Sequence, residues 1–124
     1  MKRDDLEKRN IGENLDALMV LDPRGYGVCR ILYAGSRAAT GEPLTMHAAE
    51  ALCRSVHEGD LVYILMGFVL LPHKVPEMDG MVSSMLLSRA LVLAFGAKPV
   101  IVCPQDCVEA VRRCASVVGL HIYE

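Results

Sequence analysis

The chain has 124 residues, a length that suits one domain built around one modest hydrophobic core. Hydrophobic residues make up 52% of it and charged residues 23%, which excludes a disordered protein because enough apolar surface is present to offset the entropy of ordering the chain. The net charge of -2 gives no attraction for nucleic acid, and the longest apolar run, Leu61 to Leu71, is too short to span a membrane.

The N-terminal sequence MKRDDLEKRN mixes acids and bases and has no apolar stretch behind it, so it resembles neither a secretory signal nor an organellar presequence. We expect a soluble, intracellular protein with no nucleic-acid or membrane partner. The odd number of cysteines, spread along the chain in apolar contexts, predicts free core thiols rather than a disulfide framework. They are Cys29, Cys53, Cys103, Cys107 and Cys114.

Apolar residues at near-helical spacing predict three helices in the first half of the chain. The first extends to about Leu21, where the sequence DPRGYG breaks the pattern, and the second begins near Val28. Pro43 introduces the third, predicted over about Met46 to Val56 with Thr45 as its N-cap.

The second half alternates strands with helices. The run LVYILMG is apolar on both faces, which is typical of a central parallel strand. A long helix is expected over about Gly80 to Phe95, then a strand PVIVC, a helix over about Gln105 to Val118, and a third short strand, Leu120 to Tyr123. The apolar residues of the long helix are expected in the core: Met85, Leu86, Leu87, Leu91 and Leu93.

This order of elements predicts an α/β protein with a Rossmann-like layered fold, in which a parallel sheet of about three strands is flanked by helices. Residues 1–124 are expected to form a single domain. A sheet this small has exposed edges, which predicts pairing with a second copy in a homo-oligomer or with the remainder of a longer chain.

The loop GFVLLPHKVPEMDG, between the first strand and the long helix, gathers more reactive groups than any other segment. It contains His73, Glu77 and Asp79, and the glycines at its ends, Gly67 and Gly80, permit close backbone approach. Ligands bind outside the carboxyl ends of the strands in open parallel sheets. The sequence therefore predicts the functional site in this loop.

The same loop, with its GF, PH, PE and DG pairs, resembles the signature loop of the D-glutamate cyclase family, in the catalytic C-terminal domain. The stretches ENLDALMVLDPRGYG, ILYAGSRAATGEPLT and LSRALVLAFGAKPVIV resemble other parts of that domain. The chain departs from the family pattern at Met66 and Met78, where threonine is usual, and at Ser83 and Ser84, where a glycine is usual. The resemblance implies part of a longer catalytic domain, and for the animal enzyme it implies the mitochondrial matrix.

What the resemblance implies is a lyase that cyclises D-glutamate to 5-oxo-D-proline with loss of water and without a required cofactor. Such a reaction needs a base for the ammonium group, an acid for the departing oxygen and a site for a carboxylate. Histidine changes protonation near neutral pH, so His73 is the candidate base, Glu77 in a desolvated position is the candidate acid, and Asp79 is the third catalytic candidate. The candidates for binding substrate are Arg24, Gly67, Gly80 and Ser83.

Simpler interpretations stay open for each of these residues. Asp79 could be the N-cap of the long helix, His73 a solvated loop residue, and Arg24 the partner of Asp22 across a turn. His73 and the two carboxylates could also hold a divalent cation.

Two alternatives stay open for the whole chain. One is a non-catalytic module that binds a small anion or a nucleotide, although no GxGxxG or GxxxxGK[ST] motif follows a strand. The other is an inactive fragment of the cyclase domain.

Overall fold

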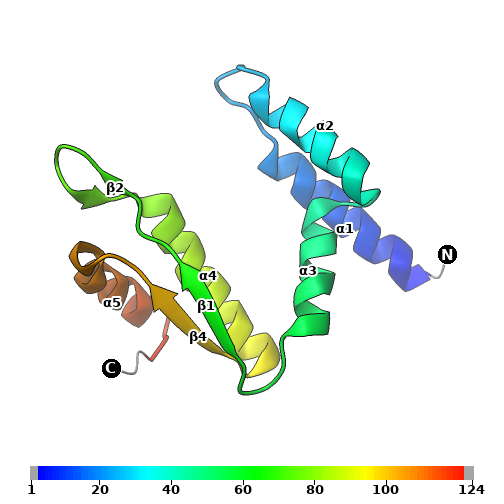
Figure 1. Cartoon of the computed structure of the whole chain (residues 1–124). Coiled ribbons are helices and arrows are strands. Elements are labelled where there is room, and N and C mark those ends of the chain that lie inside the picture. Colours follow the sequence, from blue (N-terminus) through cyan, green and yellow to red (C-terminus); the bar gives the residue numbers. More distant parts are fainter. Residues whose placement is uncertain (1–2, 122–124) are drawn as a thin grey trace. The chain divides into compact units, whose positions relative to one another are not determined.

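The computed structural model describes residues 3–121 of the chain (Figure 1). The chain divides into two compact units, Met1–Ser55 and Val56–Glu124, and each is described by itself. The single domain expected over residues 1–124 stays a prediction.

The first unit consists of three helices, α1 (Arg3–Met19), α2 (Val28–Thr40) and α3 (Leu44–Ser55). Their bounds lie within a few residues of those expected from periodicity. Helix α3 begins earlier than expected, so Thr45 lies in its first turn and the prediction of Thr45 as N-cap is wrong.

Asp16, from α1, caps the start of α3 instead. Its carboxylate accepts hydrogen bonds from the backbone N–H of Leu44 at 2.7 Å, from that of Thr45 at 2.9 Å and from the Thr45 hydroxyl at 2.6 Å. The hydroxyl of Tyr33, on α2, donates a further bond at 3.0 Å. One buried carboxylate therefore links all three helices.

The interior of this unit is small, and its buried residues are Gly12, Asp16 and Pro43. Asp16 is 2% exposed, and Gly12 lies so close to α3 that an added Cβ would be 2.8 Å from Cβ of Pro43. The apolar residues of α1 and α2 are exposed, because the polar side chains of these helices take the inward positions. The exposed apolar residues of the two helices are Leu6, Ile11, Leu15, Leu18, Met19, Val28, Ile31 and Leu32.

The second unit contains a parallel pair of strands, β1 (Leu61–Leu65) and β4 (Lys98–Val102), whose register places Leu61 beside Lys98. Helix α4 (Met78–Phe95) makes the connection between them (Figure 1). The chain then continues through a 3-10 turn (Gln105–Cys107) into α5 (Val108–Val117). The predicted α/β class, with a parallel sheet flanked by helices, is confirmed.

Two details of the second unit differ from expectation. The loop after β1 contains a short antiparallel pair, β2 (Val69–Leu70) and β3 (Val75–Pro76), which was not predicted. Of the expected third strand, Leu120 and His121 belong to no strand, and residues 122–124 lie outside the described residues.

The core of the second unit lies between α4, α5 and the inner face of the sheet. Its buried members are Met81, Met85, Cys107, Val111 and Ala115. The expectation that Leu86, Leu87 and Leu93 belong to it is wrong, since they are exposed. The buried positions of α4 follow one helical stripe, and only that stripe faces the rest of the unit.

Helix α4 is long and apolar enough to cross a membrane by length and composition alone, with a mean hydropathy of 1.4 over 18 residues. Core helices of soluble proteins meet the same criterion. Of the 18 residues of α4, 28% are buried in this structure, and they lie on the stripe that packs against its own unit.

All five cysteines are free, as predicted. The expectation that all five lie in the core is wrong for Cys29 and Cys53, which are exposed. Burial, and secondarily the neighbouring Cys107, raises the pKa of the Cys103 thiol.

Candidate functional site

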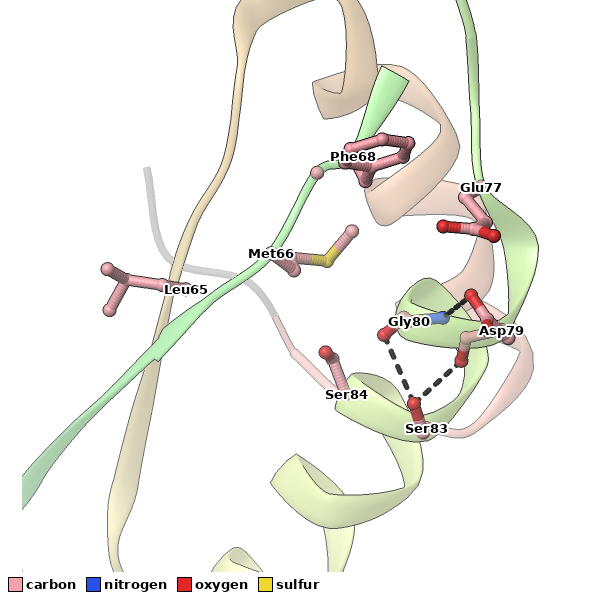
Figure 2. A pocket seen from close by; sticks show the side chains of 9 residues that line it. Leu65, Met66, Phe68, Glu77, Asp79, Gly80, Ser83 and Ser84 are labelled. Atoms are coloured by element: carbon pink, nitrogen blue, oxygen red, sulfur yellow. Dashed lines mark hydrogen bonds between the residues drawn. The ribbon is translucent and has the colours of Figure 1, made fainter. Parts of the chain in front are cut away.

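A pocket of about 540 Å³ lies at the carboxyl end of β1, where the chain leaves the strand and α4 begins (Figure 2). This volume is within the range of about 300–1,000 Å³ that is typical of small-molecule sites. The pocket is lined by Leu65, Met66, Gly67, Phe68, Glu77, Asp79, Gly80, Ser83 and Ser84.

Gly67 lets the chain turn sharply at the end of β1. Its φ is +118°, and an added Cβ would lie 2.2 Å from Cδ of Pro104, in the loop after β4. A side chain at this position is therefore excluded by both the backbone conformation and the contact with Pro104. The strand side of the pocket is formed by the end of β1 and the residues after it, Leu65 to Phe68.

We expect Gly67→Ala to lower the free energy of unfolding by about 1–3 kcal/mol, because one of the two loops must move to accommodate the methyl group. Gly35→Ala is the matched control. An added Cβ at Gly35, within α2, would have no neighbour within 4 Å. This variant should be neutral or more stable, since alanine favours helix. Urea denaturation followed by circular dichroism would measure both changes, and equal stability of the two variants would contradict the assigned role of Gly67.

The β2–β3 hairpin brings the chain back to the pocket at Glu77. The backbone N–H of Glu77 donates a hydrogen bond to the carbonyl of Phe68 at 2.9 Å. This bond places Glu77 immediately before α4, at the N-cap position, with extended backbone angles. His73 lies in the exposed turn of the hairpin and is not among the residues that line the pocket.

The carboxylate of Glu77 lines the pocket and makes no hydrogen bond or ion pair with the described residues; it points inward beside Phe68 (Figure 2). Its side chain makes no capping bond to the helix. The positive end of the α4 dipole is nearby, which favours a negative charge at this position. Glu77 is thus an unpaired carboxylate held at the pocket by its backbone. Its side chain is exposed, so the desolvated position on which its role as the acid depended is not observed.

Asp79 lies in the first turn of α4, so the alternative that it is the N-cap is wrong. Its Oδ1 accepts a hydrogen bond from the backbone N–H of Gly80 at 2.5 Å. That N–H is therefore already occupied and is not free to bind a substrate carboxylate. Asp79 and Glu77 together make the polar end of the pocket anionic.

The predicted site residues fall into two groups. Gly67, Glu77, Asp79, Gly80 and Ser83 all line the pocket. His73 and Arg24 do not: His73 is in the hairpin turn, and Arg24 is an exposed residue of the other unit.

The turn that contains Arg24 is held by Asp22 through backbone groups. The carboxylate of Asp22 accepts hydrogen bonds from the N–H of Gly27 at 2.5 Å and of Gly25 at 3.0 Å.

The hydrogen bond from Gly27 is the largest cause that lowers the pKa of Asp22, and the nearby charge of Arg30 also lowers it. The alternative in which Arg24 pairs with Asp22 is not observed among the described residues. Gly25 has a φ of +72°, in the left-handed region that glycine favours.

The sequence did not assign Leu65, Met66, Phe68 and Ser84 to the pocket. Ser84 follows Gly80 by one helical turn, and that spacing was an available signal, because residues four apart share a helix face. Within residues 3–121, no three His, Cys, Asp or Glu side chains are grouped so that they could hold a metal ion.

A protein family model described as D-glutamate cyclase-like, C-terminal, matches residues 15–124, which include every residue of the pocket. No curated protein and no solved structure matches the chain.

Proposed function

Because the chain belongs to the D-glutamate cyclase-like family, as its C-terminal domain, we propose that it is a lyase that converts D-glutamate into 5-oxo-D-proline and water. The observation that supports this most is the unpaired carboxylate of Glu77 in the pocket at the carboxyl end of β1. Catalytic groups of α/β proteins occupy this end of the sheet. No ATP or other cofactor is part of the proposal.

The proton balance of the reaction indicates what the site must do. The α-nitrogen bonds to the side-chain carboxyl carbon, and one oxygen of that carboxyl leaves as water. Both protons that the ammonium group loses end on the departing oxygen, so a single group that accepts protons from nitrogen and returns them to oxygen is sufficient. Glu77 is the proposed carrier, because it lines the pocket whereas His73, the base expected from sequence, does not.

The proposed orientation of the substrate follows from charge. The carboxylates of Glu77 and Asp79 attract the ammonium group and repel the α-carboxylate, which must therefore lie away from them. The side-chain carboxyl has to stay within reach of Glu77, which is neutral once it has accepted a proton from nitrogen and then returns that proton to the departing oxygen. Ser83 donates its hydroxyl hydrogen to the carbonyl of Asp79 at 2.6 Å but keeps lone pairs that can accept from the ammonium group. A contribution from Arg24 stays a prediction.

The alternative of a module for nucleotides or small anions is less well supported. No lysine, arginine or histidine is among the residues that line the described pocket. A phosphorylated ligand would meet two carboxylates there without a compensating positive side chain.

The direct test is to incubate the chain with D-glutamate or L-glutamate and to follow 5-oxoproline by mass spectrometry against a protein-free blank. We expect product above the blank with D-glutamate. If no product forms, calorimetric titrations with D-glutamate and with ADP separate the remaining cases. Binding of D-glutamate without turnover would indicate the inactive fragment, and binding of ADP alone would indicate the nucleotide module.

We also propose that the sheet edge pairs with another strand, from a second copy or from the rest of a longer polypeptide, which in the animal enzyme would lie in the mitochondrial matrix. In the described part of the chain, β1 and β4 pair only with each other, and Leu61, Tyr63 and Leu65 are exposed on one face of β1. Parallel sheets are usually covered on both faces. Sedimentation velocity should show concentration-dependent association, and a strict monomer at high concentration would rule out the second copy.

A further inference from the structure

Two adjacent serines of α4 line the pocket but differ in their hydrogen bonding (Figure 2). The hydroxyl of Ser83 donates to the helix backbone, at 2.6 Å from the carbonyl of Asp79 and 3.3 Å from that of Gly80. The hydroxyl of Ser84 makes no hydrogen bond with the described residues. It is half-buried, whereas Ser83 is exposed, and it points from α4 toward the loop after β1.

A partly buried hydroxyl that has no hydrogen-bond partner loses part of its hydration and makes no hydrogen bond within the protein to replace it. Helical serines commonly bond to the carbonyl four residues earlier, as Ser83 and Ser88 do here. Ser84 does not, although the carbonyl of Gly80 lies one turn before it. Its hydrogen is therefore available to a ligand.

The other side chains of the pocket cannot replace this donor. Glu77 and Asp79 accept when they are ionised, Ser83 has already committed its hydrogen, and the remaining lining residues are apolar or glycine. The Gly80 N–H is occupied by Asp79. Ser84 is thus the one lining side chain of the described pocket with a free hydrogen to donate.

We propose that Ser84 binds substrate by donating a hydrogen bond to one of its carboxylates. This inference rests on the proposed function, because it takes a dicarboxylic amino acid as the ligand. The carboxylate of such a ligand that does not react is repelled by Glu77 and Asp79, so it needs a donor away from these two residues. Ser84 supplies one from the second turn of α4.

The test compares Ser84→Ala with Ser84→Thr in steady-state formation of 5-oxo-D-proline and in calorimetric binding of D-glutamate. We expect Ser84→Ala to lower kcat/KM by about tenfold or more, as for loss of one hydrogen bond to a charged group. Ser84→Thr, which keeps the hydroxyl, should retain most of the activity. A rise in KM at constant kcat would place the bond on the carboxylate that does not react, and a fall in kcat would place it on the one that does.

Ser116→Ala is the matched control, because Ser116 is an exposed helical serine outside the pocket. Alanine favours helix at either position, so a general loss of folding cannot produce the expected difference. If the wild type is active and Ser84→Ala matches Ser116→Ala, the inference is wrong while the proposed function stands. If the wild type neither binds nor converts D-glutamate, both are wrong.

Discussion

Replacing Glu77 with glutamine is expected to lower kcat for formation of 5-oxo-D-proline by about 100-fold or more, the usual cost of removing a proton-transfer group. Glutamine preserves the size and shape of the side chain but cannot accept a proton from the ammonium group. The rate would be measured by mass spectrometry under single-turnover and steady-state conditions. Binding of D-glutamate would be measured separately, so that loss of chemistry is distinguished from loss of affinity.

The folded state should tolerate this change. The Glu77 carboxylate makes no hydrogen bond or ion pair within the described part of the chain and does not cap α4, so the midpoint of thermal unfolding should stay close to that of the wild type. Asp106→Asn, at an exposed acid of the same unit outside the pocket, is the control and should keep full activity. A Glu77→Gln protein as active as this control would exclude Glu77 as the proton carrier.

Replacing Asp16 with alanine is expected to destabilise the protein by about 2–4 kcal/mol, because it removes a helix cap and leaves several donors without a partner. The donors are the N–H groups of Leu44 and Thr45 and the hydroxyls of Thr45 and Tyr33. The change would be measured by urea denaturation followed by the helical signal in circular dichroism. Asp4→Asn, on the exposed surface of the same helix, should change stability by less than about 0.5 kcal/mol.

The same carboxylate makes stability depend on pH in acid. Burial raises the pKa of Asp16, but the hydrogen bonds from Thr45, Leu44 and Tyr33 outweigh burial and lower the pKa from 3.8 to about 2. A lowered folded-state pKa contributes stability above pH 3.8, and this contribution, about 2 kcal/mol, is lost as the pH falls from 3.8 toward 2. Asp16→Asn has no carboxylate at this position, so its free energy of unfolding should lack this pH-dependent contribution. The free energies of unfolding of the wild type and Asp16→Asn should therefore become more similar as the pH falls from 3.8 toward 2. A constant difference from pH 5 to pH 2 would contradict the assignment.

The candidate site was predictable as a segment but not as an arrangement of side chains. The position of the loop between a buried strand and a long helix indicated the pocket, and Glu77 lines it as expected. The role of each side chain depended on where α4 begins. It begins at Met78 rather than near Gly80, which moves Asp79 from the N-cap into the first turn. The unpredicted β2–β3 hairpin carries His73 into its turn and away from the pocket lining.

Local patterns in the sequence determined the helices, the parallel strand pair and the α/β class, because apolar periodicity and glycine or proline breaks act over a few neighbouring residues. Tertiary structure alone decided which side chains are capped, buried or free. Asp16 caps α3 from 28 positions earlier in the chain, and Gly67 is required by Pro104, which follows the other strand. Such contacts join residues that are distant in sequence, so they depend on how the helices and strands pack, which the spacing of residues along one element does not encode.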